Sequence, residues 1–402
     1  MLILGIETSC DETAASVIKI TEAPTKYEFK RITNIKILSN IVSSQISIHR
    51  AYGGIVPEVA ARAHIENILP VLKKALTPLA DRNIDLIAVT AGPGLVTSLL
   101  VGVEVAKTLA YVWKKPLIPI NHLIAHIYAN WLSPISPSPS VLGEGQFPAV
   151  CLVVSGGHTK LILMEDFEKF KEIGGTRDDA AGECFDKIAK LLGLGYPGGP
   201  VIAAEAAKMG TVPIWGQSPK LPRPMINSGD FDFSFSGLKT AVLYLVPHPS
   251  AMHFKKCKAL SLKGEGFISA VCAEVQQAII DVLVTKTIRA AREFKARSVI
   301  LAGGVAANSQ LRKQLESRVQ SLRSKVNFLV PPKNLCTDNA AMIAAAGYFK
   351  FIKTQEHKKH PSSRVKLTTG QVKTKSELLK IFDWSKIKVN PNLEIEKPRL
   401  YQ

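Results

Sequence analysis

The chain is poor in acidic residues for its length. Among 402 residues, 33 Asp+Glu stand against 51 Lys+Arg, which gives a formal net charge of +18. The electrostatic field of such a positive charge favours polyanionic partners: nucleic acid, an acidic membrane surface or a phosphorylated ligand. The alternative is a basic surface that binds no particular partner. With 46% apolar and 21% charged residues, the composition is that of a globular protein, and the length predicts two or three domains.

The sequence also lacks paired cysteines and long apolar runs. Its six cysteines are scattered and none forms a CxxC pair, so a zinc ribbon is not indicated. Apolar neighbours around Cys151 and Cys272 predict reduced core thiols. The apolar run 84–96 is broken by Asp, Thr, Gly and Pro, and a strand pattern begins at Leu2 with no leader before it. We therefore expect a cytoplasmic protein without a membrane partner.

What is present is an alternation of strand and helix patterns, which indicates an α/β fold. Two layouts recur in the same order in each half: a strand, polar turn and strand, then a strand, glycine turn and helix. In the first half they occupy 2–20 and 86–112, and in the second half 149–164 and 298–320. This order predicts a structural duplication, and a duplicated α/β domain places a ligand cleft between its halves.

The domain limits follow from this duplication and from composition. We expect one subdomain from residues 1–121 plus 339–353, a second from 122–338, and a basic extension at 354–402. Further helices are expected at 56–75, 178–192, 201–209, 267–295 and 338–353. Pro, Ser and Gly dominate 133–146, which predicts a loop, and 247–266 is interpreted as a basic insert. The last 54 residues carry 13 Lys+Arg against 5 Asp+Glu, a net charge of +8.

Two histidines, His122 and His126, are spaced so that a helix would put both on one face, where they could ligate one ion. The alternative is a pair of structural histidines. No Glu follows the first His, so the HExxH pattern of metallopeptidases is absent. Asp338 is the best candidate for a third ligand, although it could instead cap a helix. Two His and one carboxylate suit Fe(II), and zinc is an alternative.

Glycine-rich turns follow two apolar strands, at Val153–Thr159 and Ala302–Asn308. Glycine lets backbone N–H groups approach an anion, and a helix N-terminus adds its dipole. Neither turn matches a P-loop or GxGxxG, and a single such turn is usually only a turn. Several of them in a duplicated α/β frame favour a nucleotide cleft.

Acidic residues gather at two further turns. Asp11 and Glu12 are expected at the tip of the first hairpin beside the cleft, where they could hold a polar ligand or orient an amine nucleophile. The cluster 178–187 is expected to begin a helix, where acids suit the dipole, and 196–200 to end it as a stiff turn. No Ser/His/Asp or Cys/His triad can be assigned, so covalent catalysis is not expected.

Taken together, nine motifs in order resemble one family, the TsaD/Gcp/Kae/Qri family of tRNA threonylcarbamoyladenosine synthases. The resemblance covers about residues 1–350. It is carried by GIETSCDET (5–13), YGGIVPE (52–58), GPGL (92–95), His122 with His126, SGGHT (155–159), DDAAGE (178–183), YPGGP (196–200), FSFSGLKT (233–240) and GGVAAN (303–308).

This resemblance implies an actin-like, Hsp70/sugar-kinase-type (ASKHA) fold of two α/β domains around a nucleotide cleft. It implies transfer of a threonylcarbamoyl group from threonylcarbamoyl-AMP to N6 of adenosine 37 in tRNAs reading ANN codons. It further implies a role for each of a set of residues. These are Asp11 and Glu12 near the transferred group; Val153, Val154, Ser155, Gly156, Gly157, Asp186, Gly199 and Asn308 at the adenylate; Gly303 and Gly304 at the nucleotide; and His122, His126 and Asp338 at the metal.

The metal implied is most often iron, as Fe(2+), with zinc or magnesium as alternatives. The family also predicts partners: tRNA, a TsaB-like paralogue, a TsaE-like ATPase, a TsaC/Sua-like enzyme that makes the donor, and in stand-alone members a homodimer. Archaeal relatives have a tyrosine ligand where Val153 stands. The alternative functions are a glycoprotease-like metallopeptidase, a carbamoyltransferase or kinase of the same fold, and a scaffold without activity.

Overall fold

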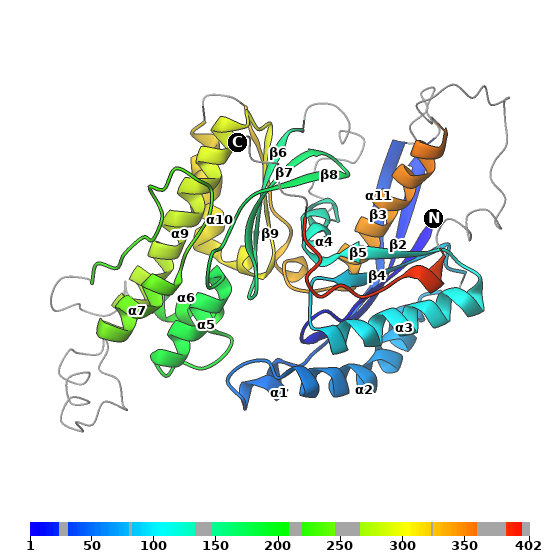
Figure 1. The fold of residues 1–402 in the computed structure, drawn as a ribbon, viewed down its shortest axis with the longest axis horizontal. Helices are drawn as coiled ribbons and strands as arrows, with labels where there is room; N and C mark the ends of the chain where they lie inside the picture. Colours follow the sequence, from blue (N-terminus) through cyan, green and yellow to red (C-terminus); the bar gives the residue numbers. More distant parts are fainter. Residues whose placement is uncertain are drawn as a thin grey trace.

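The computed structural model describes residues 1–23, 31–79, 83–132, 146–208, 219–245, 266–322, 325–359 and 383–395. Within them the chain forms two α/β halves side by side, each built on a five-stranded sheet (Figure 1). The expected loop at 133–146 and the insert at 247–266 lie almost wholly outside the described residues, as does the tail segment 360–382.

The sheet of the first half has the order β3-β2-β1-β4-β5. Its strands are β1 (Leu2–Glu7), β2 (Glu12–Ala23), β3 (Arg31–Ser44), β4 (Leu86–Gly92) and β5 (Leu117–Asn121). β1, β2 and β3 pair antiparallel as a meander, whereas β4 and β5 extend the sheet in parallel with β1. The carboxyl ends of β1, β4 and β5 therefore share one edge, where ligand sites of α/β sheets form.

The sheet of the second half has the order β10-β9-β6-β7-β8. Its strands are β6 (Ala149–Val154), β7 (Thr159–Asp166), β8 (Lys169–Gly175), β9 (Ser298–Ala302) and β10 (Asn327–Leu329). Strands β6, β7 and β8 are again antiparallel neighbours, and β9 and β10 again run parallel to β6. Each strand has its counterpart in the first half, so the predicted duplication and the α/β fold of ASKHA type are confirmed.

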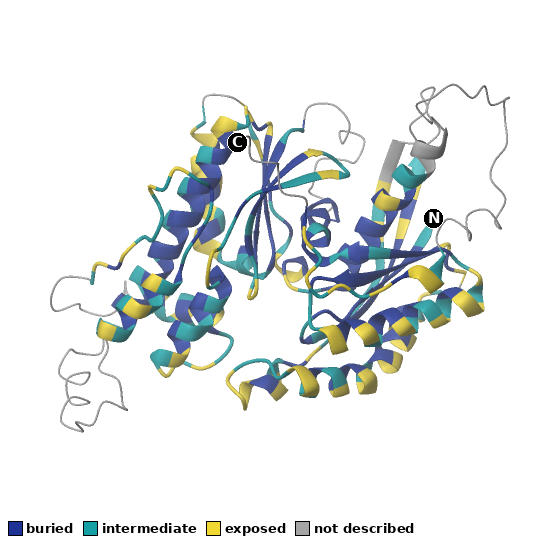
Figure 2. Cartoon of the chain, viewed as in Figure 1, coloured by how far each residue is buried: buried dark blue, intermediate teal, exposed yellow. Residues whose placement is uncertain are grey.

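Helices cover both sheets in layers (Figures 1 and 2). The outer face of the first sheet packs on α2 (Pro57–Leu76) and α3 (Val96–Trp113), and that of the second on α5 (Ala181–Leu191), α9 (Phe267–Glu293) and α10 (Ser309–Gln320). Between the sheets lie α4 (His122–Tyr128) and α11 (Ala340–Lys359), whose apolar residues join both inner faces in one core. The remaining helices are α1 (Ile46–Arg50), α6 (Gly198–Ala207) and α7 (Ser236–Leu245), with short 3-10 turns η1 (Ala129–Trp131), η4 (Gly304–Ala307), η5 (Lys333–Leu335) and η6 (Trp384–Lys386).

Close packing of α11 explains how the chain returns to the first half. A Cβ on Gly5 would stand 2.1 Å from the Ala340 carbonyl oxygen, and one on Gly347 would stand 2.5 Å from Ala88 Cβ. The alanine-rich start of α11 thus lies directly on β1 and β4. This contact fixes the position of the loop that precedes α11.

The predicted helices are present, with some different ends. Within the expected strand, turn and helix at 298–320, a 3-10 turn, η4, follows β9, and the helix α10 begins at Ser309. Asp178 lies before α5, where its carboxylate accepts hydrogen bonds from Ser234, Phe235 and Ser236. The turn 196–200 does not end α5 but leads into α6. The expectation that the acidic cluster lies near the start of a helix is correct. The groups that donate to Asp178 lie more than 50 residues away in sequence, so a local pattern could not predict them.

Two helices, α3 and α9, are long and apolar enough to cross a membrane by length and composition alone. Two thirds of the apolar window of α9 is buried within the second half, and α3 packs against β4 and α2. α9 therefore also has the packing of a core helix, whereas one third of the apolar window of α3 is buried.

Residues 383–395 of the tail form a strap across the first half. The Asn390 N–H donates to the Ala91 carbonyl oxygen at 2.8 Å, and the Gly94 N–H donates to that of Pro391 at 3.2 Å. Ile387 and Ile395 are buried in the two cores of that half. The tail is therefore, in part, an element of the first half.

Candidate metal centre and active site

Helix α4 begins at the carboxyl end of β5, and its first residue is His122. Asn121 caps it, because its Oδ1 accepts from the N–H groups of Leu123 and Ile124 at 2.9 and 3.2 Å. The Nδ2 of Asn121 donates to the Leu393 carbonyl oxygen of the strap at 3.3 Å. One helical turn after His122 stands His126, and both imidazoles are buried. The prediction of a helix that carries both histidines is confirmed.

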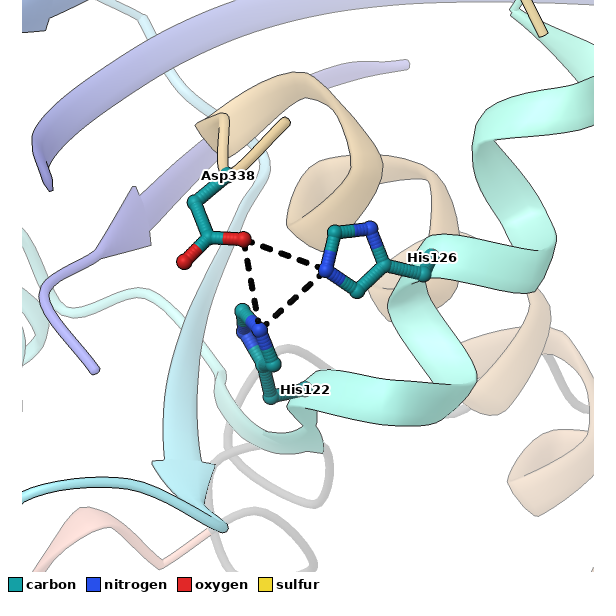
Figure 3. Close-up of side chains that lie close together, drawn as sticks. All are labelled: His122, His126 and Asp338. Atoms are coloured by element: carbon teal, nitrogen blue, oxygen red, sulfur yellow. Dashed lines mark hydrogen bonds and ion pairs between the residues drawn. The ribbon is translucent and has the colours of Figure 1, made fainter. Parts of the chain in front are cut away.

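Asp338 reaches the same point from the loop between η5 and α11. The cap of α11 is Asn339, whose Oδ1 accepts from the Met342 N–H at 3.1 Å, so the alternative role of Asp338 as a cap is wrong. Its Oδ1 lies 3.1 Å from His126 Nε2 and 3.4 Å from His122 Nε2. The two Nε2 atoms are 3.2 Å apart. Figure 3 shows the three side chains converging on one point.

These three ligand atoms fit a metal ion. Around an ion with bonds of about 2.1 Å, ligands separated by 90–109° lie about 3.0–3.4 Å apart, which is the range found here. Two imidazoles and a carboxylate form a donor set that suits Fe(II) or zinc and leaves coordination positions open. Among the described residues this is the cluster of His, Cys, Asp or Glu that could hold an ion.

The charge distribution around His122 favours cation binding. Burial alone would lower the pKa of His122, but the carboxylates of Asp338 and Glu7 raise it well above its ordinary value. Burial would likewise raise the pKa of Asp338, yet His122 and His126 hold it well below its usual range. The two carboxylates therefore stabilise positive charge at His122, and a metal ion bound at Nε2 would take the place of a proton there.

His126 differs from His122 in its surroundings. Burial lowers its pKa, so it is the neutral member of the pair. Its Nε2 faces the cluster, while its buried Nδ1 has no hydrogen-bond partner among the described residues. A neutral imidazole is the form that ligates metal ions.

The turn with Asp11 and Glu12 is held from three sides. The Gln45 N–H donates to the Asp11 carbonyl oxygen at 2.9 Å, and Ser44 Oγ donates to Glu12 Oε1 at 3.2 Å. His64 of α2 lies 2.8 Å from Thr13 Oγ1 and 3.0 Å from the Cys10 carbonyl oxygen. Burial, Asp338 and Asp11 together raise the pKa of Glu12 well above its ordinary value. The acidic turn therefore lies within electrostatic reach of the metal cluster.

The glycine turn of the second half presents backbone rather than side chains. Val153 and Val154 end β6 and are buried, whereas Gly156 and Gly157 are exposed, and a Cβ added to either would meet nothing within 4 Å. The Ser155 N–H donates to the His158 carbonyl oxygen at 2.8 Å, which closes the turn. Gly182 N–H at the start of α5 donates to the Ser155 carbonyl oxygen at 3.2 Å. The turn and the N-terminus of α5 are therefore adjacent.

Asp186 and Gly199 lie next to each other at the junction of α5 and α6. Asp186 Oδ1 accepts from the Gly198 N–H at 2.6 Å, and Gly199 follows with open space around its Cα. Burial, despite that hydrogen bond, raises the pKa of Asp186 to about 6, and Asp11 adds to the rise. The influence of Asp11 on Asp186 indicates that the acidic turn of the first half faces the second half.

Gly303 and Gly304 follow β9 but differ in surroundings. A Cβ on Gly303 would stand 2.4 Å from the Val154 carbonyl oxygen, and its φ of +91° also favours glycine, whereas Gly304 is open. Asn308 caps α10, because its Oδ1 accepts from Gln310 and Leu311, both at 3.0 Å. Its Nδ2 donates to Gln276 Oε1 at 2.8 Å. Asn308 thus has a structural role in addition to any contact with a ligand.

Comparison with known proteins identifies the family. A family model described as TsaD, tRNA N6-adenosine threonylcarbamoyltransferase, matches residues 36–345. The chain belongs to the TsaD family. A curated relative with this description from Thermomicrobium roseum is 49% identical over 366 residues, covering 87% of this chain and 92% of the relative. Another from Syntrophomonas wolfei is 48% identical over 352 residues, with the same coverage.

Among solved structures, full-length HypF in the phosphate- and nucleotide-bound form aligns with 87% of this chain and 46% of its own, with a TM-score of 0.48 and 13% identity. Membership of the TsaD family confirms the predicted enzyme class, a transferase, and favours it over the metallopeptidase alternative.

Sequence reasoning missed two groups at this site. Glu7, at the end of β1, is buried and lies 2.9 Å from His122 Nδ1. Its signal was a lone carboxylate ending an apolar strand. His158, in the glycine turn, has its pKa lowered to about 4 by burial and by His122. Only the approach of the two halves brings His158 under the influence of the metal ligands.

Proposed function

We propose that the chain transfers the threonylcarbamoyl group from threonylcarbamoyl-AMP to N6 of adenosine 37 in tRNAs that read ANN codons. The observation that carries the proposal is the TsaD family match over residues 36–345, which covers parts of both halves, the three candidate metal ligands and the proposed adenylate site, whereas Asp11 and Glu12 precede it. The convergence of His122, His126 and Asp338 supports it independently.

The donor would lie on the second half. Its site would begin at the buried end of β6, Val153 and Val154, and continue through the turn of Ser155, Gly156 and Gly157, whose two glycines are exposed with open surroundings. Asp186, Gly199, Gly303, Gly304 and Asn308 would complete the adenylate site. Exposed N–H groups of a glycine turn and the start of α6 suit a phosphate, and the Asp186 carboxyl suits ribose hydroxyls.

The first half would position the acceptor amine. In the reaction, adenosine N6 attacks the carbamoyl carbon, the bond from that carbon to the phosphate oxygen breaks, and AMP leaves. The attacking nitrogen loses one proton, and Glu12 is the proposed acceptor, because its raised pKa makes it a stronger base than an exposed carboxylate. Asp11 would orient the amine. The donor is already activated, so no protein nucleophile is needed, and positioning supplies much of the rate.

We assign His122, His126 and Asp338 as ligands of Fe(2+), with zinc or magnesium as alternatives. When bound, such an ion supplies a Lewis acid that stabilises negative charge on a substrate oxygen. Burial of both imidazoles keeps water away from the ligand bonds.

The proposed assembly follows the family. Partners would be tRNA, a TsaB-like paralogue, a TsaE-like ATPase and a TsaC/Sua-like enzyme, or a second copy of this chain, in the cytoplasm. The net charge of +18 suits tRNA phosphates and predicts salt-sensitive affinity. The domains would be 1–121 plus 339–353, 122–338, and the extension 354–402, and the packing of α11 on β1 supports the first. This division begins the second domain at His122, although α4, which carries both histidines, directly follows β5 of the first sheet.

Nucleoside mass analysis of tRNA tests the proposal. In cells depleted of this protein, threonylcarbamoyladenosine should fall, and re-expression of the chain should restore it, whereas the His122→Ala variant should not. Unchanged levels in cells with no second copy of the gene would overturn the proposal. Metal-dependent cleavage of a glycoprotein by pure protein, lost in His122→Ala, would instead favour the metallopeptidase.

A further inference from the structure

Glu7 is a fully buried carboxylate, and both of its oxygens have hydrogen-bond partners. Its Oε1 accepts from the Ser9 N–H at 2.5 Å, and its Oε2 accepts from Thr90 Oγ1 at 2.6 Å. Oε2 also lies 2.9 Å from Nδ1 of His122. Donors on both oxygens satisfy the anion, which is the condition for keeping a charge buried.

Nδ1 of His122 faces two groups, Glu7 Oε2 at 2.9 Å and Ser9 Oγ at 3.2 Å, and the shorter contact to the carboxylate decides where the ring proton lies. An ionised carboxylate can only accept a hydrogen bond, so the proton between the two groups lies on Nδ1. In the neutral ring, which is the form that ligates a metal ion, the lone pair is then on Nε2, the atom that faces His126 and Asp338 at 3.2 and 3.4 Å. His126 lacks such a partner on its own Nδ1 among the described residues.

We propose that Glu7 is the positioning residue of the metal centre: its carboxylate holds His122 in the tautomer and orientation that present Nε2 to the ion. It acts through His122 and touches neither substrate nor ion. Thr90 of β4 and the Ser9 backbone hold Glu7 in turn. This inference rests on the proposed metal ligands and deepens that assignment. Carboxylates behind ligating histidines raise the basicity of the ring and fix its direction.

Calorimetric titration of the metal-free full chain with Fe(2+) under anaerobic conditions tests this role. Glu7→Gln keeps the size of the side chain and removes its charge, and we expect affinity for Fe(2+) to fall about 10–100-fold. Activity at limiting Fe(2+) should fall in parallel and recover when Fe(2+) is in excess. A residue with only a structural role would not show that recovery.

Two further variants make the outcome decisive. Glu274→Gln removes a carboxylate of α9 that accepts from Arg223, away from the centre, and this variant should bind Fe(2+) as the unaltered chain does. Thr90→Val leaves the charge of Glu7 but removes one of the hydrogen-bond donors to it, so the affinity for Fe(2+) should fall by less than about tenfold. If Glu7→Gln does not fold, the affinity of Thr90→Val tests the role of Glu7 in its place. Unaltered affinity in the variant that folds, or lost activity that excess Fe(2+) does not restore, overturns the role of Glu7. Absence of Fe(2+) binding by the unaltered chain would instead overturn the ligand assignment.

Discussion

The two halves share one strand order but offer different chemistry at the same edge. After its first strand, the first half has a turn of ionisable side chains, with Glu7 and Asp11 buried. The second half has at the matching place a turn whose glycines, Gly156 and Gly157, leave the backbone open. One copy therefore presents charges and the other presents backbone N–H groups, a division that suits a proton transfer facing an anionic donor.

A second comparison concerns the segment after the last strand of each sheet. β5 leads at once into α4 with His122 and His126, and β10 leads through η5 to Asp338. The three candidate ligands thus come from equivalent places in the two copies. A centre shared in this way forms only when both halves are folded and packed together.

The largest expected effect comes from removing a ligand from either half. If the centre is shared, His126→Ala and Asp338→Ala should each lose bound metal and reduce activity at least about 100-fold while the chain stays folded. Metal analysis, a tRNA modification assay and circular dichroism measure the three quantities. Full activity in a variant without metal would show that the ion has no part in the mechanism. Loss of metal in only one of the two variants would show that the centre does not depend on both segments.

The next effect concerns the strap, because the described residues show this support only on the first half. Deleting residues 383–402 exposes the sites of Ile387 and Ile395, and should lower the free energy of unfolding by about 3–5 kcal/mol. It also removes the Leu393 contact to Asn121, so metal affinity should fall. Lys388→Ala changes an exposed side chain of the strap; it is the control and should leave the free energy of unfolding unchanged. Equal stability of the deletion and the control in a denaturant titration would show that the strap does not support the first half.

The two glycines after β9 differ in how closely other atoms approach them, so the same substitution should affect stability differently at each. Gly303→Ala meets the Val154 carbonyl oxygen in a left-handed backbone conformation, so stability should fall by about 2–4 kcal/mol. Gly304→Ala meets nothing within 4 Å and should leave stability within about 0.5 kcal/mol. Thermal denaturation measures both, and similar melting temperatures would contradict the close approach of the turns after β6 and β9.

The smallest effect is a pH dependence from Asp186. Burial raises its pKa from 3.8 to about 6, so its charged form is less stable in the folded chain than in the unfolded one. Its contribution to stability is full below about pH 4 and is lost as pH rises through 6. Relative to Asp186→Asn, the unaltered chain should therefore lose about 1–2 kcal/mol between pH 4 and 8, after allowance for solvent screening. A constant difference across that range would show that Asp186 titrates normally.

Much of this site was predictable because its residues lie in short, local patterns. The i, i+4 spacing of His122 and His126 needs only a helix, and the glycine turns after strands need only backbone freedom. Asp338 was predictable as a candidate third ligand, with a helix cap as the alternative role, and only the structure shows that the neighbour Asn339 caps the helix instead. Glu7 and His158 depend on contacts across more than 100 residues or between halves, which no spacing shows.

The sequence by itself determined the duplicated α/β fold, the family and the candidate ligands, because strand and helix periodicity and ordered motifs are local properties. Only the tertiary structure decided that the three candidate ligands meet and that the Glu7 carboxylate lies against His122. It alone also decided that part of the basic tail is a strap on the first half. Each of these depends on which segments, distant in sequence, pack against one another and exclude water. Burial between them then shifts the pKa values of the enclosed groups.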